Sequence, residues 1–374
     1  MKLLNKELLI KNIDEAADYD LKNNKVFGSA YYVFQKGNLI FEKCYGTTSI
    51  GGESVTPSTL FRLASMTKPV TTIATLILVE RGLIDLDDPI EKYLPKFKGI
   101  HVIDMEGKDL GEVRTPPTIR HALSHCSGIG SYCEKYAHVT QKDKETIDSY
   151  IDFFINIGLD FEPEAKQIYS GTAAFDVLAK IIELVSGKDL YSFLKEEIFD
   201  PCGMSDTIFT PSTEQWKNFI AMHNKIDGEN VEDQMKEGAV FERFPSTHYL
   251  GGAGLASTLE DYSKFAKMLL NGGEAENKRI VSRDLIQAMS TPQVPKSIMG
   301  GNERWGLGVR VITEEEYLYL PVGSFGWSGA YGSHFWIDPK NQIFAVYMKN
   351  SKFDGGAANE SARFFEKAVY SSFK

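Results

Sequence analysis

A serine and a lysine stand three residues apart in the stretch FRLASMTKPVTT, which covers residues 61–72. If a helix begins here, Ser65 and Lys68 lie on one helix face with their β-carbons close together. The amine could then accept the proton of the hydroxyl and make the serine a nucleophile. A solvated lysine beside an N-terminal serine would give the same spacing, so the motif needs support from the rest of the chain.

The Ser-x-x-Lys spacing occurs twice more, at Ser192–Lys195 and at Ser371–Lys374. The first pair lies inside an amphipathic helix pattern, and the second lies at the C-terminus, where chains fray. Ser65 differs because it stands at the expected start of a helix. Free backbone N–H groups and the positive end of the helix dipole favour a developing oxyanion there. Of the three serines, Ser65 is therefore the candidate nucleophile, and on this local evidence the solvated lysine remains the alternative.

Other patterns predict no second chemical site. His121 and His125 are four residues apart and could face one metal ion, but no third ligand is evident, so we expect a structural role. The segment GGAGLAS, residues 251–257, lacks the third glycine and the strand–helix–strand context of a dinucleotide site, and we interpret it as a tight turn. No Gly-x-Ser-x-Gly motif of an α/β-hydrolase is present. We expect neither a metal nor a cofactor.

Composition argues against several classes of partner. The chain has 374 residues, 43% hydrophobic and 25% charged, as in an ordinary soluble globular protein. A formal charge of −10 argues against nucleic acid or an anionic membrane as the main partner. The longest apolar run, TIATLILV at residues 72–79, is far shorter than the ~20 residues that cross a bilayer. The charged N-terminal stretch has no signal-peptide pattern, so we expect a cytoplasmic protein.

Periodicity predicts the elements that would position Ser65. Apolar residues recur with helical spacing over residues 5–21, and two β-rich runs flank a Lys-Gly-Asn turn within residues 29–46, which predicts a hairpin. The helix that begins near Ser65 should end at Gly82, a frequent left-handed stop. A final helix is predicted over residues 359–373. Strand patterns precede it at residues 305–312, 316–323, 334–337 and 343–348.

Strand patterns at both ends of the sequence surround a mainly helical middle, about residues 89–245. We therefore predict an α/β (α+β) fold in which about residues 1–88 and 246–374 build one antiparallel sheet, with the terminal helices on one face. The helical part would lie over the other side, and residues 1–374 would form a single unit. A crevice between the two parts is a favoured position for a small-molecule site.

Five segments in order lead to a family resemblance: FRLASMTKPVTT, RHALSHCSGI, QIYSGTAAFDVLAKIIELVSG, LGGAGLASTLEDYSKFAKMLLNGG and SFGWSGAYGSHFWIDP. Together they resemble the serine β-lactamase and penicillin-binding protein superfamily, most of all its class C side with the family VIII esterases and D-aminopeptidases. The resemblance extends from about residue 25 to about residue 350. It implies a β-lactamase/transpeptidase-like fold with three active-site motifs in the crevice.

The resemblance implies roles for the first two motifs. Ser65 and Lys68 match the Ser-x-x-Lys motif, with Ser65 as the nucleophile that forms an acyl-enzyme. Tyr169 matches the first position of a Tyr-x-Asn motif, and either Lys68 or Tyr169 could be the general base. Gly171 stands where the family has asparagine, so an amide that would contact the substrate and the lysine is absent.

The third motif of the family, Lys/His-Ser/Thr-Gly in many members, reads Trp327-Ser328-Gly329 here. The resemblance implies that these residues contact the substrate. It also implies that Ala330, which follows the glycine, donates the second backbone N–H of an oxyanion hole, the first coming from Ser65. Trp327 has an N–H donor but no positive charge, and its apolar face favours uncharged substrate groups over carboxylates.

These observations predict a serine hydrolase that acts on small carboxylic esters or amides through an acyl-enzyme on Ser65. A β-lactamase and a D-amino-acid peptidase, either a D,D-carboxypeptidase or a D-aminopeptidase, are the enzymatic alternatives. A ligand-binding member of the same fold without turnover is the alternative from another class, which Gly171 leaves open. The expected partner is a small-molecule ester, amide or β-lactam, and the oligomeric state is not predicted.

Overall fold

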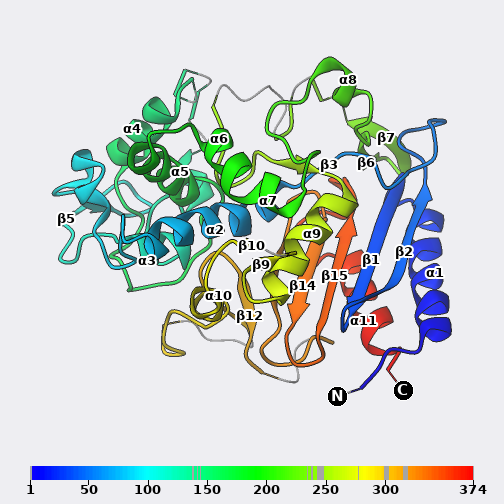
Figure 1. Ribbon diagram of the computed structural model, residues 1–374. Coiled ribbons are helices and arrows are strands. Elements are labelled where there is room, and N and C mark those ends of the chain that lie inside the picture. The colour runs from blue at the N-terminus through cyan, green and yellow to red at the C-terminus, as the bar shows by residue number, and fades with distance from the viewer. Residues whose placement is uncertain are drawn as a thin grey trace.

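The computed structural model describes residues 2–136, 139–140, 142–143, 145–233, 235–236, 239–241, 248–276, 278–298, 303–314 and 319–373. Within these residues, an antiparallel sheet of seven strands occupies one side of the molecule, and most helices lie on the other side (Figure 1). The strands follow the order β11-β12-β13-β14-β15-β1-β2. Their bounds are β1 Gly28–Gln35, β2 Asn38–Gly46, β11 Glu303–Trp305, β12 Arg310–Ile312, β13 Phe325–Ser328, β14 His334–Asp338 and β15 Ile343–Met348.

The centre of the sheet joins the two ends of the sequence. β1 pairs with β15 in antiparallel register, with Ala30 opposite Met348. β1 and β2 form the predicted hairpin, which turns at Lys36 and Gly37 with φ values of 50° and 82°. Glycine adopts such positive φ values without steric cost, which suits this tight turn. The prediction of one antiparallel sheet built from both ends of the chain is confirmed.

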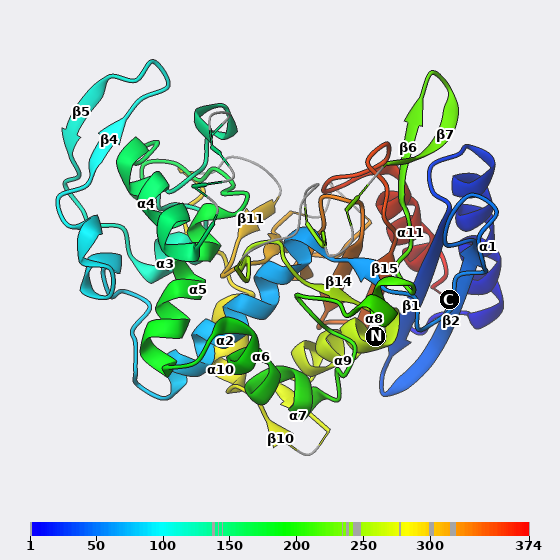
Figure 2. The same cartoon turned by 90° about the horizontal axis from the view of Figure 1, so that it is seen from above.

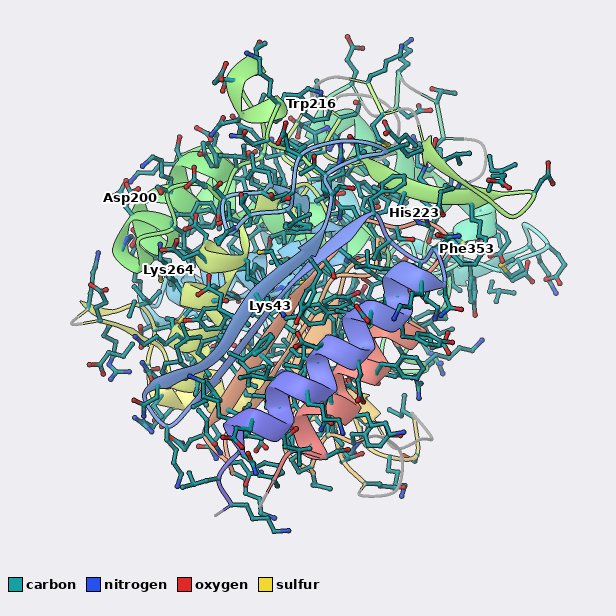
Figure 3. All side chains as sticks on the ribbon, turned by 90° about the vertical axis from the view of Figure 1, so that its right-hand side faces the viewer. Lys43, Asp200, Trp216, His223, Lys264 and Phe353 are labelled. Atoms are coloured by element: carbon teal, nitrogen blue, oxygen red, sulfur yellow. The ribbon has the colours of Figure 1, made fainter. Side chains whose placement is uncertain are left out.

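Helices α1 (Lys6–Lys22) and α11 (Glu360–Tyr370) lie side by side on one face of the sheet, as predicted (Figures 1 and 2). Asn5 caps α1 because its side chain accepts hydrogen bonds from two N–H groups of the first turn. Figure 3 looks onto this side, where Lys43 of β2 forms an ion pair with Asp14 of α1 at 2.7 Å. The two helices contribute a shared apolar face to the core, made of Leu9, Ile13, Ala17, Phe365, Ala368 and Val369.

The opposite face of the sheet is covered by α9 (Leu259–Leu270), which contacts β1, β14 and β15. The 3₁₀ turn η1 (Ala64–Met66) leads into α2 (Thr67–Glu80), which extends from the sheet into the helical part and packs against α5 and α6 (Figure 2). Every residue from Thr67 to Leu78 is buried, as expected for a helix at the centre of a core. This helix places the Ser-x-x-Lys motif where the sheet and the helical part meet.

The remaining elements surround this centre. The other helices are α3 Ile119–Leu123, α4 Ile147–Ile157, α5 Ala173–Ser186, α6 Leu190–Leu194, α7 Asp200–Cys202, α8 Thr213–Trp216 and α10 Arg283–Met289. Shorter helical turns are η2 Ile90–Lys92, η3 Pro95–Phe97, η4 Cys133–Tyr136 and the π-helical η5 Lys195–Phe199. Short strand pairs are β3 Phe61–Arg62 with β8 Ala256–Ser257, β4 His101–Ile103 with β5 Asp109–Glu112, β6 Met222–Ile226 with β7 Glu229–Asp233, and β9 Glu274–Ala275 with β10 Lys278–Arg279.

Three details differ from the sequence predictions. Residues 305–312 are not one strand: they comprise the end of β11, a turn over residues 306–309 and β12, because the chain reverses at Gly308, whose φ is +66°. Of the predicted strand 316–323, residues 316–318 lie outside the described residues and 319–323 form no strand. The middle of the chain also contains the hairpins β4–β5 and β6–β7. None of the described helices combines the length and apolar character that crossing a membrane requires.

Candidate active site

Ser65 lies in the 3₁₀ turn η1, just before α2, with 9% of its surface exposed. The preceding Ala64 has a φ of +45°, a left-handed conformation that costs an L-residue about 1–2 kcal/mol. Such strain persists only where the surrounding structure imposes it. Here the buried phenol of Tyr262 on α9 donates a hydrogen bond to the Met66 carbonyl at 2.9 Å, and β3 pairs with β8 just before the turn. The serine is therefore held on a rigid backbone.

Lys68 is completely buried beside this serine. Its Nζ lies 3.3 Å from Ser65 Oγ, 2.5 Å from the Gly171 carbonyl oxygen and 2.8 Å from the Gly252 carbonyl oxygen. Three acceptors match the three N–H donors of an ammonium group. The ring of Tyr169 lies under the same nitrogen, with its centroid 4.9 Å away, which adds a cation–π attraction.

Tyr169 belongs to a cluster of aromatic rings next to the lysine. The indole Nε1 of Trp327 on β13 donates a hydrogen bond to the Tyr169 hydroxyl at 3.1 Å. Trp305 at the end of β11 stacks on Tyr169 with ring centroids 5.5 Å apart and meets Trp327 edge to face at 4.4 Å. The structure thus brings the first, second and third motifs together. Trp305 was not predicted, because aromatic residues on strands most often serve the core.

Gly171 contributes its backbone to the site. Its carbonyl accepts a hydrogen bond from Lys68, so an oxygen of this residue takes the contact with the lysine that an asparagine amide was expected to make. A Cβ built on Gly171 would meet no heavy atom within 4 Å, so the absence of a side chain is not forced by lack of space. The second carbonyl comes from Gly252 in the segment 251–257, which forms the predicted turn: the Gly254 N–H donates to the Leu250 carbonyl.

The two side chains of the third motif point to opposite faces of β13, as alternation along a strand requires. Trp327 lies on the face that contacts Tyr169 and Trp305. Ser328 faces α11, where its hydroxyl hydrogen-bonds to His334 Nδ1 at 2.8 Å and His334 Nε2 lies 3.0 Å from Glu366 Oε1. Ser328 is 2% exposed. The prediction that Ser328 contacts the substrate is therefore limited to its backbone.

The end of β13 approaches the segment before Ser65 very closely. A Cβ built on Gly329 would lie 2.4 Å from the Leu63 carbonyl oxygen, so only glycine fits there. The Gly329 N–H donates to the Ser333 carbonyl at 2.8 Å and closes a turn that carries Ala330. Ala330 is exposed, and its carbonyl accepts a hydrogen bond from the backbone. The close approach of Gly329 to the Leu63 carbonyl places the Ala330 backbone beside the turn that holds Ser65.

His125 lies behind Tyr169 and was not expected at the site. Its ring is 1% exposed and packs against Tyr169 and Trp305 with centroid distances of 4.6 and 4.3 Å. Nδ1 accepts a hydrogen bond from the Ser170 N–H at 3.1 Å, which fixes the backbone next to Tyr169. Burial, and secondly the charge of Lys68, hold the pKa of His125 well below its ordinary value. The imidazole is therefore neutral.

His121 and His125 have separate partners. His121 Nε2 lies 3.0 Å from Glu164 Oε1, and its Nδ1 accepts a hydrogen bond from the Thr118 N–H that starts α3. The structure thus gives each ring a structural contact of its own. Within the part of the chain that the structure describes, no three His, Cys, Asp or Glu side chains are grouped so that they could hold a metal ion.

The sequence model of the β-lactamase family matches residues 11–367. The chain belongs to the β-lactamase family. Esterase EstB of Burkholderia gladioli is 25% identical over 93% of this chain and 92% of its own length. Protein Rv1367c of Mycobacterium tuberculosis is 28% identical over 86% of this chain and 85% of its own length. The solved structure of EstCE1, a hydrolase with promiscuous acyltransferase activity, superposes with a TM-score of 0.81 at 23% identity, covering 98% of this chain and 99% of that one.

These similarities confirm the β-lactamase/transpeptidase-like fold that the sequence predicted. Membership of the β-lactamase family, together with an esterase among the relatives that match nearly the whole chain, identifies the protein as a serine hydrolase. Substrate preference and the roles of individual residues depend on the geometry of the site.

Proposed function

We propose that the protein hydrolyses small, uncharged carboxylic esters or amides through an acyl-enzyme on Ser65. The observation that carries this proposal is the position of Trp327. An indole N–H, rather than a lysine or histidine cation, meets the Tyr169 hydroxyl at the third motif. At this position of the third motif a substrate carboxylate would meet an uncharged indole, whereas an acyl or alkyl group would contact a flat apolar ring.

The contacts of Lys68 support a role as general base. Two backbone carbonyls, those of Gly171 and Gly252, bind two N–H groups of its amine. In the neutral amine these two hydrogens occupy the carbonyls, so the lone pair points to the third neighbour, Ser65 Oγ at 3.3 Å. The serine proton then moves to Nζ while Oγ forms a bond to the acyl carbon.

The negative charge that develops on the acyl oxygen needs donors in place before the reaction. The backbone N–H groups of Ser65 and Ala330 are the proposed donors. Their support is the close approach of Gly329 to the Leu63 carbonyl, which brings the two backbone segments together. Removing one donor of this kind typically costs about 3–4 kcal/mol of transition-state stabilisation.

Tyr169 is the proposed acid for the leaving group. Its hydroxyl oxygen receives the Trp327 N–H, which leaves its own hydrogen available for another acceptor. When the C–O bond of the ester breaks, this hydrogen moves to the alkoxide, and the proton that Lys68 took from Ser65 restores the Tyr169 hydroxyl. Water then attacks the acyl carbon while Lys68 accepts its proton. The bond between the acyl carbon and Ser65 Oγ breaks, Oγ regains the proton from Lys68, and the carboxylic acid leaves.

The substrate class is tested by comparing kcat/KM for a short-chain p-nitrophenyl ester with kcat/KM for a chromogenic cephalosporin, which carries a carboxylate. We expect the ester to be preferred by at least about tenfold, since a missing charge-assisted hydrogen bond costs roughly 1.5–3 kcal/mol. A preference for the cephalosporin would overturn the proposed substrate class in favour of a β-lactamase.

A further inference from the structure

The segment that follows β15, residues 349–356, contacts both sides of the proposed oxyanion hole. We call it the brace segment. It is packed against β6, where the His223 N–H donates to the Asn350 carbonyl at 3.0 Å and the Lys352 N–H donates to the His223 carbonyl at 2.8 Å. His223 and Phe353 lie near each other on this side of the molecule in Figure 3.

One end of the brace segment binds the strand before Ser65. The side chain of Asn350, 1% exposed, accepts a hydrogen bond from the Arg62 N–H at 2.9 Å and donates one to the Arg62 carbonyl at 3.0 Å. An amide side chain thus pairs with both backbone groups of β3, as a neighbouring strand would. Arg62 is three residues from Ser65, so this pairing fixes the position of the backbone that leads to the Ser65 hydroxyl and N–H.

The other end of the brace segment binds the turn after β13. The Ser351 N–H donates to the Tyr331 carbonyl and the Gly356 N–H donates to the Ala330 carbonyl, both at 2.9 Å. A Cβ built on Gly355 would lie 2.5 Å from the Ala330 carbonyl oxygen, so the two backbones are in direct contact. The brace segment therefore holds the peptide units on both sides of the Tyr331 α-carbon. The peptide unit that carries the Ala330 N–H is fixed within the same turn, because its Gly329 carbonyl accepts a hydrogen bond from the Gly332 N–H at 3.0 Å.

A buried ion pair closes the brace segment on itself. Lys349 is fully buried and its Nζ lies 2.5 Å from Asp354 Oδ2, which also accepts a hydrogen bond from the Ser361 hydroxyl at the start of α11. The lysine stem lies beneath the same turn, since a Cβ built on Gly332 would lie 2.1 Å from Lys349 Cε. Breaking a buried pair leaves a costly unpaired charge, so this closure is rigid.

We propose that the brace segment sets the separation between the Ser65 and Ala330 N–H donors, and that Asn350 is a positioning residue of the active site. This inference rests on the proposed function, because it needs an oxyanion at these two groups. Donors of an oxyanion hole act only when they lie about 2.7–3.1 Å from the developing charge. Small displacements therefore weaken binding of the transition state more than binding of the substrate.

Two variants test this inference through different parts of the segment. Asn350→Asp keeps the side-chain shape but loses the donor to Arg62, and Asp354→Asn weakens the ion pair with Lys349 without touching β3. Each is assayed for the inhibition constants of an alkyl trifluoromethyl ketone, which forms an oxyanion adduct, and of the matching alcohol, which does not. We expect the ketone to bind about tenfold more weakly, with the alcohol changed less than twofold.

Asn12→Ala serves as the control, because it removes side-chain hydrogen bonds to Ala368 and Ser372 far from this site. It should change neither constant. Equal weakening of ketone and alcohol binding, or no change in either, overturns the positioning role. If Asn350→Asp does not fold, the result for Asp354→Asn decides alone. Labelling of Ser65 by a fluorophosphonate is followed in the same samples. Absence of labelling in the parent would instead overturn the proposed function.

Discussion

Trp327 donates its indole N–H to the hydroxyl of Tyr169 across 3.1 Å, and the two rings lie 5.2 Å apart. This contact joins the third motif of the β-lactamase family to the second without using a charged side chain. It holds Tyr169 next to the buried Lys68, whose Nζ lies 4.9 Å from the centre of the tyrosine ring. In the proposed mechanism the same contact orients the acid and selects uncharged substrates.

Replacing Trp327 tests the selection of uncharged substrates. Trp327→Lys restores a cation at the third motif, so the ratio of cephalosporin to ester kcat/KM should rise by about tenfold. Trp327→Phe keeps the ring and loses the donor, so it should lower the activity toward both substrates without shifting this ratio. An unchanged ratio in the lysine variant would show that the third motif does not choose between charged and neutral substrates.

Lys68 and Tyr169 should act as one unit. Lys68→Ala and Tyr169→Phe are each expected to lower kcat by at least about 10²-fold, as the loss of acid–base catalysis does. The double variant should be little worse than the poorer single one, because Lys68 and Tyr169 pass the proton of Ser65 on to the leaving group in one relay, and residues that act as a unit are not additive. Steady-state kinetics on one ester measures all four proteins, and fully additive losses would assign the two groups to separate steps.

The contact between Gly329 and Leu63 predicts a sharp difference between two glycine substitutions. Gly329→Ala places a methyl group 2.4 Å from the Leu63 carbonyl oxygen, so the turn must shift and kcat should fall by about 10²-fold or more. Overpacking of this kind costs about 1–3 kcal/mol in the free energy of unfolding. Gly171→Ala, whose methyl group enters open space, should keep the free energy of unfolding of the parent. A kcat of Gly329→Ala within twofold of the parent would contradict the proposed donor at Ala330.

The neutral state of His125 predicts a pH dependence of stability. The folded pKa lies well below the ordinary value of about 6.5, chiefly through burial, so below pH 6.5 the unfolded chain binds a proton that the folded protein does not. This group therefore costs stability as the pH falls, by about 1 kcal/mol between pH 6.5 and 5.5. The free energy of unfolding is measured with urea at both pH values. Between them it should fall by about that much less in His125→Gln than in the parent. Equal losses would mean that His125 is protonated in the fold.

The order of the terminal helices and of the central strands could be read from the sequence, because each of these elements has a local signal. The helix at residues 5–21, the Lys-Gly turn and the strands at 334–337 and 343–348 appear within one or two residues of their predicted bounds. The two-strand form of residues 305–312 was missed, because strands of three residues leave too short a pattern and the reversal depends on the backbone angle of Gly308.

Side chains of the site could be predicted better than its backbone contacts. Residue types and spacing pointed to Ser65 and Lys68, and the family resemblance added Tyr169 and Trp327. The fold brings the four side chains together. The carbonyl of Gly252 could not be foreseen, because every residue carries a carbonyl and only the tertiary structure decides which one faces the lysine. Ser328 shares a strand with Trp327, and its face follows from alternation only once the face of Trp327 is known.

The central claim is that the reaction passes through an acyl group on Ser65. Its most direct test is intact-mass spectrometry and peptide mapping of the protein quenched during turnover of an activated short-chain ester, with Ser65→Ala and Ser192→Ala alongside. We predict a mass increase equal to one acyl group that maps to Ser65. The adduct should remain in Ser192→Ala, and both the adduct and ester turnover should be lost in Ser65→Ala. An adduct on another serine, or undiminished turnover by Ser65→Ala, would contradict the mechanism.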